Sequence, residues 1–580
     1  MRTYILALTK YGITATVIGF TVLAFFLLTR KETKSHETIR VLTLVQNAMI
    51  LLFQLLSFFT LYVALEDASY MLFGLFVMVI FFVIFYLYQT LYEHANMPLF
   101  NDMCMLLSVG LVIQARLSFS NATHQLAIAA IGLVIAFVLP KFRKYFSLLK
   151  KPKYWYGILS VGVLAGVMLL GSTTLGANLT YTIAGVTFQP SEFMKIVFLL
   201  FLASTLEDCR DFKQFCIITV FAAAHVLCLI GSTDLGSGLI YYMIFMFVAF
   251  LATGQWIILA GGTGLLAGGA VACYYLFDHI QQRVQAFLDP WSLIDSIGYQ
   301  IAQSLFAISA GGLWGTGLGQ GTPEDIPFAE SDFIFAAVCE ELGQIIGVCV
   351  ILICLNCFFV MLNLAGSFAD RFYRLLAYGT AIAYVFQTFL TIGGEVKFIP
   401  LTGVTLPFIS YGGSSILTTL IMFTLIEIMC ILRGEKIDEV RRRQEQRREE
   451  TRTQRAHPSG GRIPEGQRFI PAASQQRIGS AQGDVQRRRA STGARVRSSY
   501  YEEDYDRARR QAAGAEYRSR PEGDDIYSEY DRRTRRAAAY EHDGRTGSMA
   551  YAARGSSRAG TGSMRSASDG DDSYWDDNDE

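Results

Sequence analysis

The stretches VLTLVQNAMILLFQLLSFFTLYVAL (residues 41–65) and MLFGLFVMVIFFVIFYLYQTLY (residues 71–92) decide the fold, because each is an almost uninterrupted apolar run. A helix needs about 20 apolar residues to cross the hydrocarbon core of a membrane, and both runs are long enough. Similar runs recur along the chain with short polar breaks, a repetition that a buried soluble core does not explain. The sequence therefore predicts an all-α integral membrane protein.

The apolar runs predict about thirteen transmembrane helices. They fall near residues 10–29, 41–65, 71–92, 102–117, 125–140, 155–172, 192–206, 214–231, 237–253, 255–277, 333–363, 375–394 and 408–432. The first run lacks a small-residue cleavage site and is soon followed by another, so it predicts a retained helix rather than a signal peptide.

The positions of Lys and Arg predict how the spans are oriented, because short loops rich in these residues stay in the cytoplasm. The basic clusters are Arg30, Lys31, Lys34 and Arg40, then Lys141, Arg143, Lys144, Lys150, Lys151 and Lys153, then Arg210 and Lys213, then Arg371 and Arg374, and finally the tail. With thirteen spans, all of these fall on one side. The N-terminus, which carries Arg2 and Lys10, then lies outside as a mild exception. The same alternation places the loops 232–236, 278–331 and 395–407 outside.

The part of the chain beyond Leu432 differs sharply in composition from the rest. The 580 residues have a formal net charge of +0, yet 30 of the 50 Lys and Arg and 27 of the 50 Asp and Glu lie beyond Leu432. This tail has few large apolar residues, so we expect residues 433–580 to be disordered and cytoplasmic, either as a solvated spacer or with docking sites. Its first part could instead extend the last helix and rest on anionic lipid. Interleaved acids disfavour nucleic-acid binding.

Cysteine and histidine give no sign of a disulfide framework or a metal site. Most of the ten cysteines lie inside apolar runs, where cysteine behaves as a small hydrophobic residue. Cys354 and Cys357 form a CxxC, but within the membrane-like run ILICLNCFFV. The seven histidines do not cluster at metal-ligand spacing.

The stretch between residues 278 and 331 is too long and too unusual for a simple connector. It contains glycines at 311, 312, 315, 317, 319 and 321, which do not form GxGxxG and follow no strand. A nucleotide-binding loop is therefore disfavoured. The glycines suit a tightly folded re-entrant loop.

Asp332 is the leading catalytic candidate, because it immediately precedes the apolar run FIFAAV at the predicted membrane boundary. Desolvation there raises the pKa of a carboxyl from about 3.9, which suits a general base. The structural alternative is that Asp332 is simply the N-cap of the following helix, a position that favours Asp.

Other charged residues at predicted membrane positions have both functional and structural interpretations. Glu340 and Glu341 lie deeper on the same helix, where hydrogen bonding inside the bundle is the structural alternative. Glu192 and Lys195 are three residues apart and predict an internal ion pair. Asp234 begins a span on the outer side, and the few cations near that face, which would hold a diphosphate or snorkel to the interface, are Arg116, Arg283 and Lys397.

Four motifs together resemble the SEDS (shape, elongation, division and sporulation) family, of the RodA/FtsW/SpoVE type. They are TDLGSG (233–238), FLDPW (287–291) with GYQIAQSLFAISAGGLWGTGLGQG (298–321), IPFAESDFIFAAVCEELG (326–343) and FIPLTGVTLPFISYGGSS (398–415). The resemblance runs from about Met105 to Leu432 and covers roughly ten spans. It implies three parts: extra N-terminal helices in 1–100, a catalytic core in 101–432 and the tail in 433–580.

The resemblance implies a peptidoglycan glycosyltransferase of the bacterial cytoplasmic membrane that polymerises lipid II at the outer face. It also implies a class B penicillin-binding protein as partner, and an essential acid at Asp332. We expect Asp332 to deprotonate the acceptor sugar hydroxyl while undecaprenyl diphosphate leaves, and Arg283 and Lys397 to stabilise the leaving charge. Further candidate substrate-binding residues are Asp234, Gln300, Gln303 and Glu341.

The sequence leaves several points open. No cofactor is certain, and a divalent cation such as Mg²⁺ fits a diphosphate substrate. The tail would contact cytoplasmic division or elongation proteins, and the biological process is division, elongation or sporulation. The alternative functions are a lipid II flippase and a non-catalytic scaffold for a penicillin-binding protein. A flippase typically has its site at the midplane, whereas the unusual residues here crowd the outer face.

Overall fold

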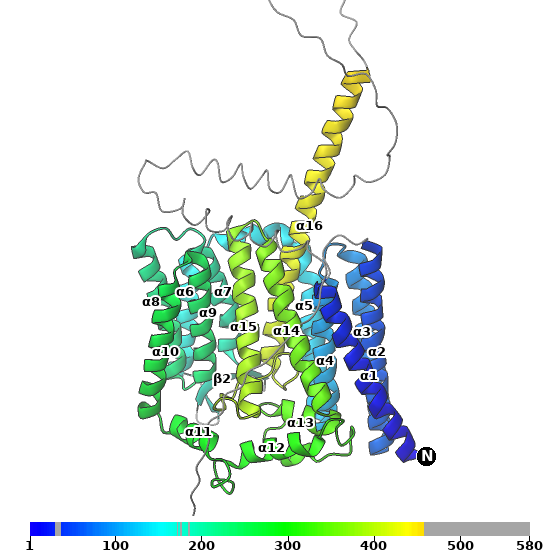
Figure 1. Ribbon diagram of the computed structural model, residues 1–580. Helices are drawn as coiled ribbons and strands as arrows, with labels where there is room; N and C mark the ends of the chain where they lie inside the picture. Colours follow the sequence, from blue (N-terminus) through cyan, green and yellow to red (C-terminus); the bar gives the residue numbers. More distant parts are fainter. Residues whose placement is uncertain (30–35, 171, 175–176, 184–185, 457–580) are drawn as a thin grey trace, which may run out of the picture. The chain divides into compact units, whose positions relative to one another are not determined.

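The structure is a computed structural model that describes residues 1–29, 36–170, 172–174, 177–183 and 186–456. Residues Met1–Gly461 form one compact unit. Figure 1 shows this unit as a bundle of long helices that run side by side, with shorter helices gathered at one end. Of the tail predicted for 433–580, residues 457–580 lie outside the described residues.

The helices of the bundle follow the predicted apolar runs. They are α1 (Arg2–Thr29), α2 (His36–Leu65), α3 (Ala68–Leu91), α4 (Met97–Leu117), α5 (Phe119–Val138), α6 (Lys153–Leu170), α7 (Pro190–Leu206), α8 (Phe212–Gly231), α9 (Leu235–Thr253), α10 (Trp256–Leu276), α14 (Gln344–Ser367), α15 (Arg371–Glu395) and α16 (Gly413–Ala456). Among the described residues, 12 helices are long and apolar enough to cross a membrane. The 17-residue α7 lies among them as the thirteenth. The prediction of an all-α membrane protein with about thirteen spans is confirmed.

Shorter elements connect the long helices. They are η1 (Leu139–Lys150), α11 (Asp278–Leu288), α12 (Tyr299–Gly311), η2 (Pro323–Asp325) and α13 (Ile334–Leu342), with strands β1 (Ser172–Thr174), β2 (Ala177–Ile183) and β3 (Val186–Phe188). The strands pair antiparallel in the order β1-β2-β3. This small sheet was not predicted, although alternating β-branched residues around Gly176 and Gly185 are a hairpin signal.

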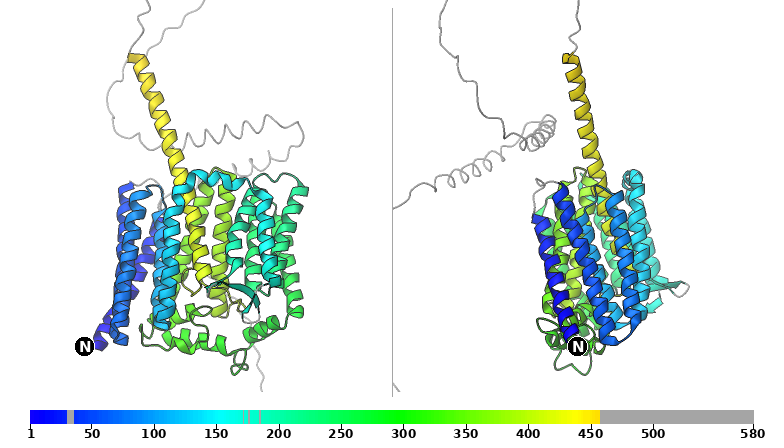
Figure 2. Two further views of the ribbon diagram at one scale, coloured as in Figure 1. Left: turned by 180° about the vertical axis from the view of Figure 1, so that it is seen from behind. Right: turned by 90° about the vertical axis from the view of Figure 1, so that its right-hand side faces the viewer.

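The two ends of the bundle differ in character (Figure 1). The loop end holds α11, α12, α13 and the N-terminus, and Figure 2 shows the same arrangement from behind and from the side. The basic end holds η1 and the extension of α16. Contacts at this end link distant basic and acidic residues: Lys150 Nζ lies 2.5 Å from Asp370 Oδ2, and Lys153 Nζ lies 2.6 Å from Asp208 Oδ2. The described basic clusters thus gather at one end, as the alternation predicted.

The expected single helix over 333–363 is wrong, because the chain breaks at Gly343. Here α13 ends and α14 begins, and Gly343 has a φ of 96°, which favours glycine. A Cβ atom at this position would lie 2.4 Å from the backbone nitrogen of Gly315. The break therefore lets the glycine-rich segment after α12 pack directly against the backbone at Gly343, between α13 and α14.

The expected disorder from Arg433 is also wrong for its first 24 residues, since α16 continues as helix to Ala456. Glu435 pairs with Arg143 of η1, and Asp438 Oδ2 lies 2.9 Å from His94 Nε2. Farther along, Glu439 and Arg443 form an i,i+4 pair. Such pairs stabilise an exposed helix, so the alternative of a helical extension is the one that the structure shows.

Candidate active site at the loop end of the bundle

Asp332 lies in a turn that is fixed by hydrogen bonds to its backbone neighbours. Its own N–H donates to Phe328 O at 3.1 Å, and Phe328 adopts a φ of 60°. Two residues before Asp332, the backbone carbonyl of Glu330 accepts from the Gln114 side chain and from the Tyr411 N–H, each at 2.7 Å. The turn is thus tied to α4 and to the segment before α16, which restricts where the Asp332 carboxylate can lie.

The N-cap role considered for Asp332 belongs to another carboxylate. The N-cap residue of α13 is Phe333, which makes no side-chain capping bond. Instead Glu395, fully buried at the end of α15, accepts a hydrogen bond from the Ala336 N–H at 2.9 Å through Oε2. A carboxylate that accepts from a first-turn N–H does the work of a cap. The Asp332 carboxylate is therefore not used to cap α13.

The environment of Asp332 favours its protonated form relative to water. Desolvation by burial raises the pKa of this carboxyl above its ordinary value, while the Ser331 side chain and the Arg283 guanidinium act in the opposite direction. A carboxylate with a raised pKa is a stronger base than a solvated aspartate. The site is therefore suited to taking a proton from a substrate hydroxyl.

Arg283 of α11 connects Asp332 to the segment that follows α15. Its Nη1 donates to the carbonyls of Leu401 at 3.3 Å and Thr402 at 3.0 Å. A Cβ atom at Gly403 would lie 3.6 Å from Arg283 Nη2 and 3.8 Å from Asp332 Oδ2. The guanidinium and the carboxylate thus flank the same glycine, whose φ of 71° and lack of a side chain keep this space open.

Asp234 belongs to the same group of charges. It is the N-cap of α9, where Oδ1 accepts from the Ser237 N–H at 3.1 Å, and Oδ2 accepts from Ser191 Oγ at 3.3 Å. Burial lowers the pKa of Arg283, and the nearby charges of Asp332 and Asp234 counteract this effect. One cation therefore lies within electrostatic reach of both acids.

The structure does not bring the other predicted site residues to this group. Lys397 acts on Asp289 of the FLDPW motif instead: hydrogen bonds from Ser292 lower the pKa of Asp289, and the charge of Lys397 adds a smaller effect in the same direction. Gln300 and Gln303 lie half-buried on α12, and neither side chain hydrogen-bonds to another described residue. Glu341 is engaged on both oxygens, since Oε1 accepts from Arg116 Nε at 2.7 Å and Oε2 accepts from the Gly319 N–H at 2.9 Å.

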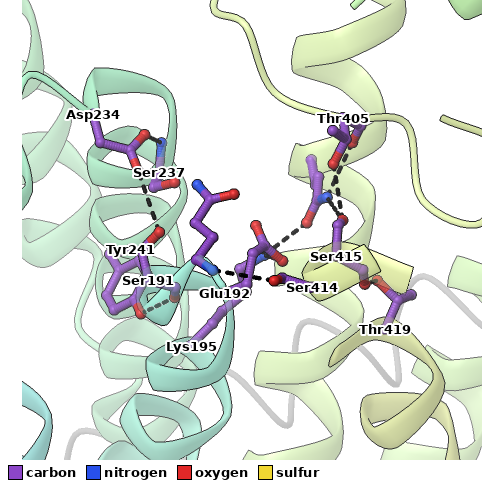
Figure 3. Close-up of polar contacts among 12 residues, drawn as sticks. Ser191, Glu192, Lys195, Asp234, Ser237, Tyr241, Thr405, Ser414, Ser415 and Thr419 are labelled. Carbon is purple, nitrogen blue, oxygen red and sulfur yellow. Dashed lines mark hydrogen bonds and ion pairs between the residues drawn. The ribbon is translucent and has the colours of Figure 1, made fainter. Parts of the chain in front are cut away.

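A second polar cluster lies inside the bundle, between α7, α9, α15 and α16 (Figure 3). Lys195 Nζ lies 3.0 Å from Glu192 Oε2 and donates to Gln387 Oε1 at 2.8 Å, so the predicted ion pair is present and buried. Gln387 in turn donates to Ser415 Oγ at 3.2 Å. Sequence reasoning missed Gln387 and Ser415, because neither is charged and their partners are distant in the chain.

Sequence reasoning also missed Glu395. It is a charged residue at the start of a predicted outer loop, and that placement of an acid beside an apolar span was an available signal. Among the described residues, no three His, Cys, Asp or Glu side chains come together in a way that could hold a metal ion. The charges that interact with one another around Asp332 are those of Arg283, Asp234 and Glu395.

Comparison with known proteins gives consistent matches over the core. The family model FtsW/RodA/SpoVE, described as cell cycle protein, matches residues 94–433. The peptidoglycan glycosyltransferase RodA of Mycobacterium tuberculosis (strain ATCC 25618 / H37Rv) is 35% identical over 328 residues, covering 53% of this chain and 69% of that protein. The probable peptidoglycan glycosyltransferase FtsW of Geobacter sp. (strain M18) is 34% identical over 283 residues, covering 46% of this chain and 74% of that protein.

A solved structure gives the same match in three dimensions. Its subject is the structural coordination of polymerization and crosslinking by a peptidoglycan synthase complex. The similar chain in that structure is 26% identical, with a TM-score of 0.51, and the match covers 58% of this chain and 97% of that one.

Proposed function

Because this chain belongs to the FtsW/RodA/SpoVE family of cell cycle proteins, we propose that it is a peptidoglycan glycosyltransferase that polymerises lipid II. The observation that carries the proposal is the geometry at Asp332. This half-buried carboxylate has a raised pKa, is not needed to cap α13 and lies beside the same glycine, Gly403, as a guanidinium. A base beside a cation is what transfer of a sugar from a diphosphate requires.

In the proposed reaction, Asp332 takes the proton from the acceptor sugar hydroxyl. The hydroxyl oxygen forms a bond to the anomeric carbon of the donor, and the bond between that carbon and the diphosphate oxygen breaks. The electron pair leaves with undecaprenyl diphosphate. The proton on Asp332 then passes to solvent or to the departing diphosphate, which restores the base.

We assign Arg283 to the charge that develops on the diphosphate, since it is a fixed cation near Asp332. Asp234 caps the N-terminus of α9, and its negative charge favours the charged form of Arg283. Gln300 and Gln303 are proposed to hydrogen-bond sugar or peptide groups of the substrate. Lys397, which lies near Asp289, is proposed to interact with the negative charge of the diphosphate. Glu341 contributes indirectly, because both of its oxygens already hold the protein chain.

The proposed setting is the bacterial cytoplasmic membrane, with the loop end outside and the tail in the cytoplasm. This orientation is supported by the basic residues at the opposite end of the bundle from α11, α12 and α13 (Figure 1). The proposed partner is a class B penicillin-binding protein, which supplies the transpeptidase activity. Support comes from the similar chain in a peptidoglycan synthase complex. The proposed division remains 1–100, 101–432 and 433–580, with α16 helical into the last part.

The experiment that tests the function uses the full chain with its cognate transpeptidase in liposomes that contain labelled lipid II. Glycan strands that a muramidase digests would support the polymerase. Movement of lipid II between leaflets without polymer would instead indicate a flippase. Neither polymer nor movement in a folded complex would indicate a scaffold. Parallel reactions with Mg²⁺ and with a chelator would establish the divalent-ion requirement.

A further inference from the structure

Helices α1, α2 and α3 lie outside the residues 94–433 that match the family, so the family assigns them no role. We propose that α1 and α2 form a brace that positions the catalytic turn, acting through the glycine loop, defined here as residues 311–321. In this proposal Lys10 of α1 is a positioning residue. The effect on activity rests on the proposed function, whereas the effect on the loop does not.

The brace contacts the glycine loop from two helices. From α1, the Lys10 ammonium donates to Gly315 O at 2.6 Å, and the Tyr11 ring meets the Trp314 ring edge-on with centroids 5.3 Å apart. From α2, Ala64 approaches so closely that a Cβ atom at Gly319 would lie 2.8 Å from Ala64 Cβ. The loop is therefore held from the N-terminal side by one charged hydrogen bond, one ring contact and the close approach of the Ala64 methyl group to Gly319.

The glycine loop is in turn bonded to α13. The Thr316 N–H donates to Glu340 O at 2.8 Å, and the Gly317 N–H donates to Glu341 O at 3.0 Å. The Gly319 N–H donates to Glu341 Oε2 at 2.9 Å. These bonds fix the C-terminal turn of α13, while Glu395 fixes its first turn. Asp332 lies two residues before this short helix, so a shift of the loop is transmitted to the carboxylate.

The brace itself is fixed to the core by buried polar contacts between α2 and α4. Gln54 Nε2 donates to Ser108 Oγ at 2.8 Å, and Asn101 Nδ2 lies 3.2 Å from Gln46 Oε1. Polar side chains in a membrane interior are costly unless they are bonded, so they specify one register between the helices. This attachment of α2 to α4 is what allows the brace to resist movement of the loop.

The position of Lys10 explains the exception to the charge rule. A lysine on the outer side of the first span is unfavourable for the predicted orientation. Arg2, the other cation there, donates to Glu66 Oε1 at 2.5 Å and to Ala64 O at 2.6 Å. Both cations therefore have partners at the loop end. Lys10 is the one whose partner, Gly315, belongs to the glycine loop.

The test compares hydrogen exchange and polymerisation in the full chain with its transpeptidase. Lys10→Met removes the ammonium but keeps a long side chain, Lys10→Arg keeps a donor, and Leu8→Met changes an exposed neighbour as the matched control. We expect amide exchange in 311–321 to rise several-fold in Lys10→Met, and kcat to fall about 5-fold with KM for lipid II unchanged. Lys10→Arg should restore both values, and Leu8→Met should change neither.

Unchanged exchange in folded Lys10→Met would overturn the brace, whether or not the protein makes polymer. Faster exchange with unchanged kcat would overturn the link from the loop to Asp332. If the wild type makes no polymer, the proposed function fails, and the exchange result still decides the brace. If Lys10→Met does not fold, Tyr11→Leu removes the ring contact without removing the charge and carries the same expectations.

Discussion

Glu395 accepts a hydrogen bond from the Ala336 N–H at 2.9 Å, so a residue from the end of α15 caps the short helix that follows Asp332. The two residues are 59 positions apart in the chain. The contact joins the motif that contains Asp332 to the last residue of α15, and it frees the Asp332 carboxylate from a structural task. The two acids therefore have separate roles, Glu395 in holding α13 and Asp332 in chemistry.

Removing the Glu395 carboxylate that caps α13 should lower the stability of the protein and reduce its rate of polymerisation. Glu395→Ala leaves the Ala336 N–H without its acceptor, and lost caps cost about 1 kcal/mol, with a range of about 0.5 to 2. Thermal unfolding of the detergent-solubilised protein should show a lowered Tm together with reduced polymerisation. Glu395→Gln keeps an oxygen acceptor and is the matched control. A normal Tm in Glu395→Ala would show that the contact does not support α13.

The pH dependence of polymerisation should report the raised pKa of Asp332. A general base must be ionised, so activity is present above the pKa of the folded enzyme and is lost as the pH falls through it. Because burial raises this pKa, the acid limb should lie above the range of an ordinary aspartate, about 3.9. A kcat/KM profile measures it, and an acid limb at or below pH 4 would contradict the account.

The guanidinium of Arg283 should be needed for its shape as well as its charge. In Arg283→Gln the cation that lowers the pKa of Asp332 is gone, so the acid limb should move to higher pH. Arg283→Lys keeps the charge but cannot bond both the Leu401 and Thr402 carbonyls in the same way. We expect the limb to stay in place in Arg283→Lys while kcat falls about 10-fold. Identical profiles for both variants would separate Arg283 from Asp332.

The buried ion pair of Lys195 and Glu192 within α7 should matter for stability rather than for chemistry. Lys195→Met leaves the Glu192 carboxylate buried without its cation, which costs about 3 to 5 kcal/mol. Adding Glu192→Gln removes the unpaired charge, so the double variant should recover part of the lost Tm. Denaturation of both variants in one detergent measures this. A single variant as stable as the wild type would show that the pair contributes little.

The spans could be predicted from sequence because their length and apolarity are local properties. The break at Gly343 could not, because it depends on the approach of Gly315 from an earlier part of the chain. The capping role of Glu395 could not be predicted either, since its partner Ala336 lies 59 residues earlier in the chain. Asp332 could be selected from its position at a membrane edge. Excluding its role as an N-cap required the structure, which shows that Glu395 accepts from the first turn of α13. Lys397 was grouped with Arg283 because both lie in predicted outer loops. Lying on the same face does not bring two side chains together, and Lys397 acts on Asp289 instead.

The most direct measurement is polymerisation of labelled lipid II by the full chain with its transpeptidase, comparing wild type with Asp332→Asn. The two side chains have nearly the same shape, but the amide cannot accept the proton. Binding of lipid II and the Tm are measured in parallel, to separate chemistry from folding. The account predicts that Asp332→Asn binds lipid II, unfolds at a temperature close to the wild type and forms no glycan strands. Strands formed at the wild-type rate would contradict it and remove Asp332 from the reaction.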